Sequence, residues 1–208
     1  MKRLESYAAT LRQHHFAVEV VGNRAEALLR MQSEIERTAP AIVSFGDSLT
    51  MRATGIIDWL KSESRFTLID GFDRSMPRPE RIEIRRQGLL ADLFITGVNA
   101  ITEQGSLHWL DMVGNRIAGV AFGPRKVIIV AGRNKIVATR NDAEERIRRI
   151  AAPQNMARHP EFRTPCATTG VCMDCNSPDR ICNTRMEMMR CYPEHRILVI
   201  LIDEDLGL

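Results

Sequence analysis

The sequence predicts an α/β fold: an open, mostly parallel sheet with helices on both faces. Short apolar, β-rich runs alternate with amphipathic helical segments along most of the chain, which is the pattern of βαβ units. The 208 residues are 44% apolar and 26% charged, enough to bury the core of one domain. A final run of six apolar residues, 197–202, is typical of a strand buried on both sides.

The predicted elements follow in order from the amino terminus. The first helix carries Leu4, Ala8 and Leu11 on one face. Asn23, a good helix-capping residue, precedes the second helix. The predicted helices are 1–15, 25–37, 48–61, 78–90 and 142–150. The predicted strands are 16–21, 41–45, 66–69, 92–96, 127–130 and 196–202, with a strand, tight turn and strand at 101–107.

The tract 153–195 differs in character, because proline, cysteine and polar residues occur there without clear periodicity. It lies between the last predicted helix and the last predicted strand. We therefore divide the chain into an α/β core (1–152), a cysteine-rich metal-binding insertion (153–195) and a final strand that returns to the core (196–208).

Composition argues against several classes of protein. The net charge of +3 gives no argument for binding nucleic acid or an anionic membrane surface. No apolar run approaches the roughly 20 residues of a membrane span. The amino terminus has no apolar segment of the secretory type, so we expect a cytoplasmic protein with reduced thiols.

All five cysteines lie in the last quarter of the chain. Cys166, Cys172, Cys175 and Cys182 have the spacing C-x5-C-x2-C-x6-C, and four thiolates so close in sequence can converge on one centre. An odd number of cysteines in a reducing compartment argues against a disulfide framework. We predict that these four are metal ligands and that Cys191 is a spare thiol or a core residue.

The spacing favours an iron–sulfur cluster, of the 4Fe-4S type, over zinc. Structural zinc sites usually have two C-x2–4-C elements, whereas this loop has one, and iron–sulfur clusters tolerate irregular spacing. Arg163, Arg180 and Arg185 are expected to offset the thiolate charge. Zinc is the alternative, and a loop of buried thiols without metal is the third interpretation.

Two loops follow predicted strands, at the edge where open α/β sheets bind ligands. The first opens a helix, and its amides and hydroxyls predict an anion site formed by Gly46, Asp47, Ser48 and Thr50. The alternative is an ordinary helix cap.

The second loop contributes Gly97 and Asn99, and Lys135 adds a positive charge after the strand at 127–130. Glu103, in a Glu-x-Gly turn, is the candidate base or nucleophile, the alternative being a solvated hairpin residue. Further polar candidates for the same cleft are Asp111, Asn115, Arg116 and Asn134.

The order of these motifs resembles the lactate-utilisation (LUD) domain family. The resemblance covers nearly the whole chain and rests on residues 46–50, 91–102, 114–116, 122–130 and 152–155 and on the cysteines downstream. It implies an open fold of the glucosamine-phosphate deaminase, ribose-phosphate isomerase and CoA-transferase type. In that superfamily the loop matching 46–50 binds substrate phosphate, and the nucleophilic glutamate of CoA-transferases lies in a turn that Glu103 resembles.

Family members are linked to multi-subunit, iron–sulfur-dependent oxidation of lactate. The resemblance therefore implies an accessory subunit of a redox complex that oxidises lactate or a related hydroxy acid, with protein partners and a small anionic organic substrate. Two alternatives remain open. One is a standalone isomerase or CoA-transferase-like enzyme that uses Glu103, and the other is a metal-stabilised binding module.

Overall fold

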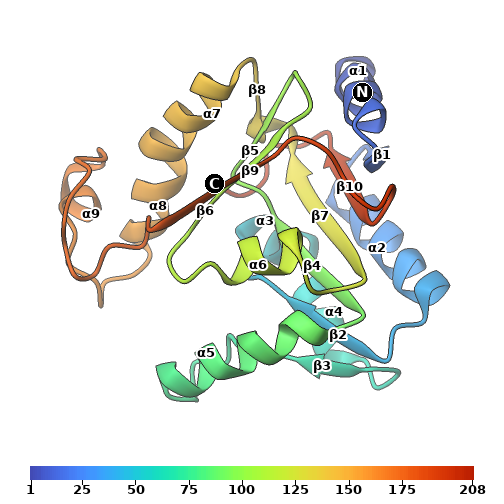
Figure 1. Cartoon of the computed structure of the whole chain (residues 1–208), viewed down its shortest axis with the longest axis horizontal. Helices are drawn as coiled ribbons and strands as arrows, with labels where there is room; N and C mark the ends of the chain where they lie inside the picture. Colours follow the sequence, from blue (N-terminus) through green and yellow to red (C-terminus); the bar gives the residue numbers. More distant parts are fainter.

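The computed structural model describes residues 1–208 and contains a large and a small sheet (Figure 1). The large sheet has six strands in the order β1-β10-β7-β4-β2-β3, and all neighbouring strands are parallel. Its strands are β1 (Ala17–Val21), β2 (Ile42–Phe45), β3 (Thr67–Ile69), β4 (Leu93–Gly97), β7 (Lys126–Gly132) and β10 (Ile197–Ile202). The predicted α/β fold with a parallel sheet is confirmed.

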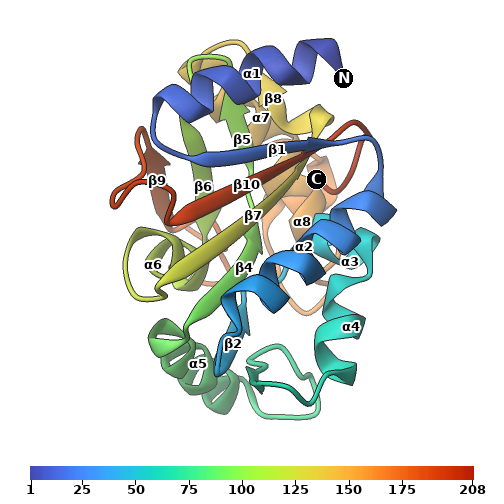
Figure 2. The same ribbon diagram turned by 90° about the vertical axis from the view of Figure 1, so that its right-hand side faces the viewer.

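Helices cover both faces of this sheet (Figure 2). Each face has its own apolar cluster of 17 buried residues, to which successive residues of β7 and β10 contribute in alternation. One cluster includes α2 (Arg24–Thr38), α3 (Leu49–Thr54) and α4 (Ile56–Ser62), and the other includes α1 (Lys2–Gln13) and α6 (Asn115–Ala121). Gly55, at φ 77°, divides the predicted helix 48–61 into α3 and α4.

The small sheet has the order β8-β5-β6-β9. Its strands are β5 (Ala100–Thr102), β6 (Leu107–Asp111), β8 (Ile136–Val137) and β9 (Thr184–Met188). The hairpin predicted at 101–107 is confirmed as β5 and β6, which pair antiparallel. The cysteine-rich tract contains β9, which pairs with β6, before the chain returns as β10 to the large sheet between β1 and β7.

A helical run from α7 (Arg140–Arg146) through a π-helical segment (Ile147–Ala151) to α8 (Ala152–Ala157) leads into the cysteine-rich tract. The π-helical segment precedes Pro153, which cannot donate a backbone hydrogen bond. The domain boundary predicted after residue 152 falls inside this run. The remaining helices are α5 (Arg78–Gln87) and α9 (Pro165–Thr169), with 3-10 turns at Gly88–Leu90 and Arg133–Lys135. None of the helices is both long and apolar enough to cross a membrane.

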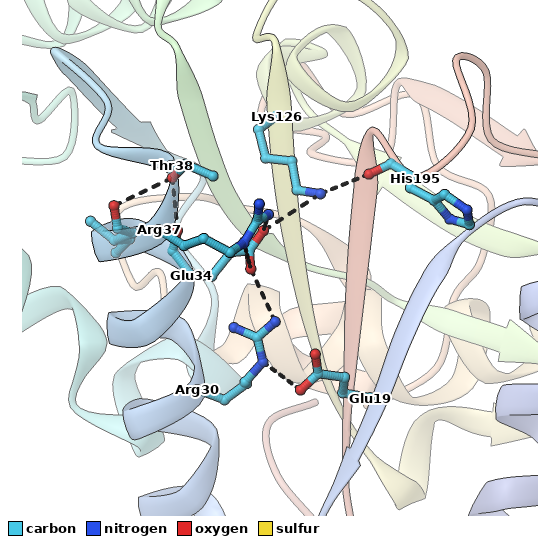
Figure 3. Close-up of polar contacts among 8 residues, drawn as sticks. Glu19, Arg30, Glu34, Arg37, Thr38, Lys126 and His195 are labelled. Carbon is cyan, nitrogen blue, oxygen red and sulfur yellow. Dashed lines mark hydrogen bonds and ion pairs between the residues drawn. The ribbon is translucent and has the colours of Figure 1, made fainter.

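Glu34 ties α2 to the large sheet (Figure 3). Its buried carboxylate accepts hydrogen bonds from Arg37 at 2.5 Å and Arg30 at 3.0 Å, and Lys126 Nζ of β7 lies 3.6 Å away. Burial by itself raises the pKa of Glu34, but the two arginine hydrogen bonds and the charge of Lys126 outweigh it and lower that pKa to about 2. The ionised carboxylate therefore stabilises the folded state.

Replacement Glu34→Gln is expected to lower the free energy of unfolding at pH 7 by about 3 kcal/mol, because it leaves buried cations without their partner. Since the folded-state pKa lies below the ordinary value of 4.5, the contribution is present at neutral pH and is lost as the pH falls toward about 2. Urea unfolding at pH 7 and pH 3 measures this, and the difference from wild type should shrink at the lower pH. Exposed Glu36 of the same helix is the control position, and equal effects of Glu36→Gln and Glu34→Gln would contradict the account.

Candidate functional site

A cleft of about 700 Å³ lies at the carboxyl ends of β2, β4 and β7. Its walls include the loop after β2, the junction of β4 and β5, and Lys135 after β7, with α5, α8 and the segment after α8 opposite them. This is the edge at which open α/β sheets bind ligands, because the carboxyl ends of parallel strands meet there.

The fold brings several predicted site residues together in this cleft. Asp47, Ser48, Asn99 and Lys135 line it, and so do three of the further polar candidates, Asp111, Asn115 and Arg116. Asn134 does not, because its side chain accepts from the Leu206 amide and donates to the Gly207 carbonyl.

The other predicted residues of the two loops have packing roles. A Cβ at Gly46 would lie 2.6 Å from Arg116 Cγ, and one at Gly97 would lie 2.3 Å from Ser48 Oγ, so both positions require the close approach that glycine allows. Thr50 is fully buried and donates to the Leu206 carbonyl at 3.2 Å. Ser48 is the N-cap of α3, as the alternative interpretation of this loop predicted.

Glu103 lies away from the cleft. Its carboxylate accepts from Tyr7 Oη at 2.9 Å and lies 3.5 Å from Arg3 Nη2, and both partners belong to α1. The side chain is 38% exposed at the β5–β6 turn. The structure therefore does not bring Glu103 together with Ser48 or Lys135, and its contacts with α1 are those of a surface hairpin residue.

The cleft is strongly cationic. Eight of its lining residues are arginine or lysine and four are acidic. Only Arg52 and Arg116 are ion-paired, with Asp47 at 2.9 Å and Asp111 at 2.7 Å. The other six form no ion pair with any Asp or Glu of the chain: Arg74, Arg78, Arg81, Arg85, Arg158 and Lys135. Such unpaired cations favour an anionic ligand.

Three of these arginines share one face of α5, at positions 78, 81 and 85. Arg85 donates to the Gly71 carbonyl at 2.8 Å and stacks over Phe72 at 4.2 Å, and burial followed by the charges of Arg81 and Arg78 lowers its pKa. Arg81 Nε is buried without a hydrogen-bond acceptor. A buried donor without an acceptor is costly, so this atom is suited to a ligand oxygen. This row of arginines was not predicted, although its three- and four-residue spacing in the sequence indicates one face of a helix.

Lys135 lies at the floor of the cleft and is 4% exposed. Its Nζ donates to the Val98 carbonyl at 3.0 Å. Burial, and then the charges of Arg146 and Arg116, lower the pKa of Lys135 to about 7. Arg146 is also buried and donates to the Asn99 carbonyl at 2.6 Å. The pKa of Lys135 is thus lowered at a position where no Asp or Glu forms an ion pair with it.

A small polar network holds the wall formed by Asn99, the end of β6 and the start of α6. Asp111 accepts hydrogen bonds from the Arg116 amide and guanidinium and from the Ile117 amide. Asn99 Oδ1 accepts from the Leu110 amide at 3.0 Å and from Arg116 at 3.2 Å. These bonds fix the side chains that shape the cleft before any ligand binds.

The four cysteines predicted as ligands line one small pocket beyond α8: Cys166, Cys172, Cys175 and Cys182. Arg180 holds this loop by donating to the Cys175 carbonyl at 2.6 Å and to the Cys182 carbonyl at 3.1 Å. Burial raises the pKa of the Cys182 thiol, Arg180 opposes this, and Cys172 and Cys175 add to it. Of the three arginines expected to offset thiolate charge, Arg180 lines the pocket, whereas Arg185 pairs with Glu144 of α7.

The four sulfurs of this pocket are soft donors, of the kind that bind zinc or iron–sulfur clusters. No three His, Cys, Asp or Glu side chains are arranged to hold a metal ion. Cys191 lies in the apolar core, which confirms one of the two roles predicted for it.

The cleft and the cysteine pocket are neighbours. Ala152 of α8 and Ile181 of the cysteine loop line both of them. The two spaces therefore share a wall, and a group held by the thiols would lie next to a ligand in the cleft.

Similarity to known proteins identifies the family of this chain. No curated protein matches the sequence. A crystal structure of a DUF162 family protein from Deinococcus radiodurans is similar in fold, with 15% sequence identity, a TM-score of 0.54, and coverage of 97% of this chain and 96% of that one. The family model of the LUD domain matches residues 4–202, and the chain therefore belongs to the LUD domain family.

Proposed function

We propose that this LUD-domain protein binds a small anionic organic substrate in the cleft and acts as a subunit of a complex that oxidises lactate or a related 2-hydroxy acid. The observation that carries the substrate class is the set of six cleft cations without ion pairs. A carboxylate supplies the negative charge that these cations lack, and arginine binds it through two parallel hydrogen bonds. Membership of the LUD family supports the redox role.

The cysteine pocket is the second part of the proposal. An iron–sulfur cluster bound by Cys166, Cys172, Cys175 and Cys182 would supply one-electron transfer. Arg180 keeps the loop in shape through its bonds to two cysteine carbonyls. The shared wall supports a functional link between the two spaces, and partner subunits would be the onward electron acceptors.

The CoA-transferase alternative loses its main support. It rests on Glu103 as nucleophile, and that carboxylate contacts Tyr7 and Arg3 of α1 instead of lining the cleft. Nothing in the geometry favours it over a cleft that binds a carboxylate.

Isothermal titration calorimetry with lactate and pyruvate tests the substrate class. We expect saturable binding that weakens as salt rises from about 0.05 M to about 0.5 M, because salt screens charge–charge attraction. Lactamide has nearly the same shape without the charge and is the matched control. Absence of carboxylate binding, or equal binding of lactamide, would refute the proposal.

A further inference from the structure

Lysine is rare in this chain: only four of the 29 basic residues are lysines. Lys61 and Lys126 form ion pairs with carboxylates, and Lys2 lies exposed in α1. Lys135 is the one lysine that lines the cleft. Arginine does not lose its proton in proteins, so Lys135 provides the only amine in the cleft that can become neutral and nucleophilic.

The surroundings of Lys135 favour the neutral amine. Its hydrogen bond to the Val98 carbonyl leaves the other positions on Nζ without a protein partner. The charged groups that act on it are Arg146 of α7 and Arg116 of α6, the second of which is paired with Asp111. Gly207 lies close to it, since a Cβ built on Gly207 would be 3.3 Å from Nζ. Burial and the like charges together lower the pKa of Lys135 to about 7.

We propose that Lys135 forms an imine with a carbonyl compound that bears a carboxylate or phosphate, an inference that rests on the proposed anion site. The carbonyl requirement follows from the nucleophilic amine, and the anion requirement follows from the unpaired arginines, above all Arg81 and Arg85.

Imine formation requires neither an oxidant nor a reductant. The Nζ lone pair attacks the carbonyl carbon, a C–N bond forms, and the C=O π pair moves to oxygen. The carbinolamine takes up one proton from solvent and loses water, which gives the protonated imine of Lys135. Addition of water reverses the step and releases the carbonyl compound.

Borohydride trapping tests the inference on the full chain. The protein is incubated with pyruvate or with dihydroxyacetone phosphate, which are both ketones, then reduced with borohydride, and its peptides are weighed by mass spectrometry. We expect modification of Lys135 at more than about ten times the level at Lys2, Lys61 or Lys126, because far more of Lys135 is neutral at pH 7. Acetone, which has the carbonyl without the charge, should leave Lys135 at background. The anion that reacts better identifies the substrate as carboxylate or phosphate.

Two further measurements test whether the trapped imine forms at Lys135. Trapping at Lys135 should decline below pH 7, because the ammonium has no lone pair, and Lys135→Met should abolish it while the variant melts no lower than wild type. If calorimetry shows pyruvate binding but no adduct forms at Lys135, the imine is refuted and the anion site stands. If pyruvate neither binds nor reacts, both fail.

Discussion

Replacing Arg81 and Arg85 together with alanine is expected to weaken pyruvate and lactate binding by roughly 100-fold or more. Arg81 Nε is buried without an acceptor, and Arg85 is held in place by the Gly71 carbonyl and the Phe72 ring. Each arginine therefore offers a pre-positioned charge-assisted hydrogen bond of about 1.5–3 kcal/mol. Isothermal titration calorimetry of the double variant measures the loss.

Arg86 provides the matched control on the same helix. Its side chain is 73% exposed, faces away from the cleft and pairs with Glu83 at 3.7 Å. Arg86→Ala removes one positive charge from α5, against two in the double variant, and should leave the affinity within about twofold of wild type. An equal loss of affinity in Arg86→Ala would show that only the overall charge matters. Unchanged affinity in the double variant would show that the anion binds elsewhere.

The second large effect is expected at the cysteine pocket. Cys172→Ser with Cys175→Ser removes both thiolates of the C-x2-C element, half of the proposed ligand set. After anaerobic reconstitution with iron and sulfide, wild type should hold the metal and absorb broadly in the visible range. The double variant should hold almost none, and its melting temperature should not rise on reconstitution, because metal that binds only the folded state adds to stability.

Cys191→Ala is the control for this experiment, since Cys191 is a core residue whose thiol donates to the Pro193 carbonyl. It should keep its metal content despite some loss of stability from the smaller side chain. Wild-type protein that stays colourless and holds about one zinc per chain would contradict the cluster and favour the structural zinc alternative.

The large sheet was predictable because its central strands are buried on both faces. Short continuous apolar runs rich in Ile and Val, such as Ile197–Ile202 and Val127–Val130, are typical of strands buried on both faces. The edge strand β9 was not predictable. Arg185 and Glu187 alternate there with methionine, and the segment becomes a strand through its pairing with β6.

The strand-end part of the site was predictable for the same reason. Parallel strands end at one edge, so residues that follow β2, β4 and β7 had to meet there, as Ser48, Asn99 and Lys135 do. Two features depended on tertiary packing instead. The β5–β6 turn packs against α1, which places Glu103 at that helix. The packing of α5 places Arg81 and Arg85 in the lining of the cleft.

The most direct test of the whole account asks whether the cleft and the cysteine pocket act as one site. Reconstituted protein is reduced without oxygen, and its electron paramagnetic resonance spectrum is recorded with and without saturating pyruvate. We predict a cluster signal that changes when pyruvate binds wild type and that stays constant in the Arg81→Ala, Arg85→Ala variant. A cluster signal that pyruvate leaves unchanged, while calorimetry shows that the ligand is bound, would contradict the account.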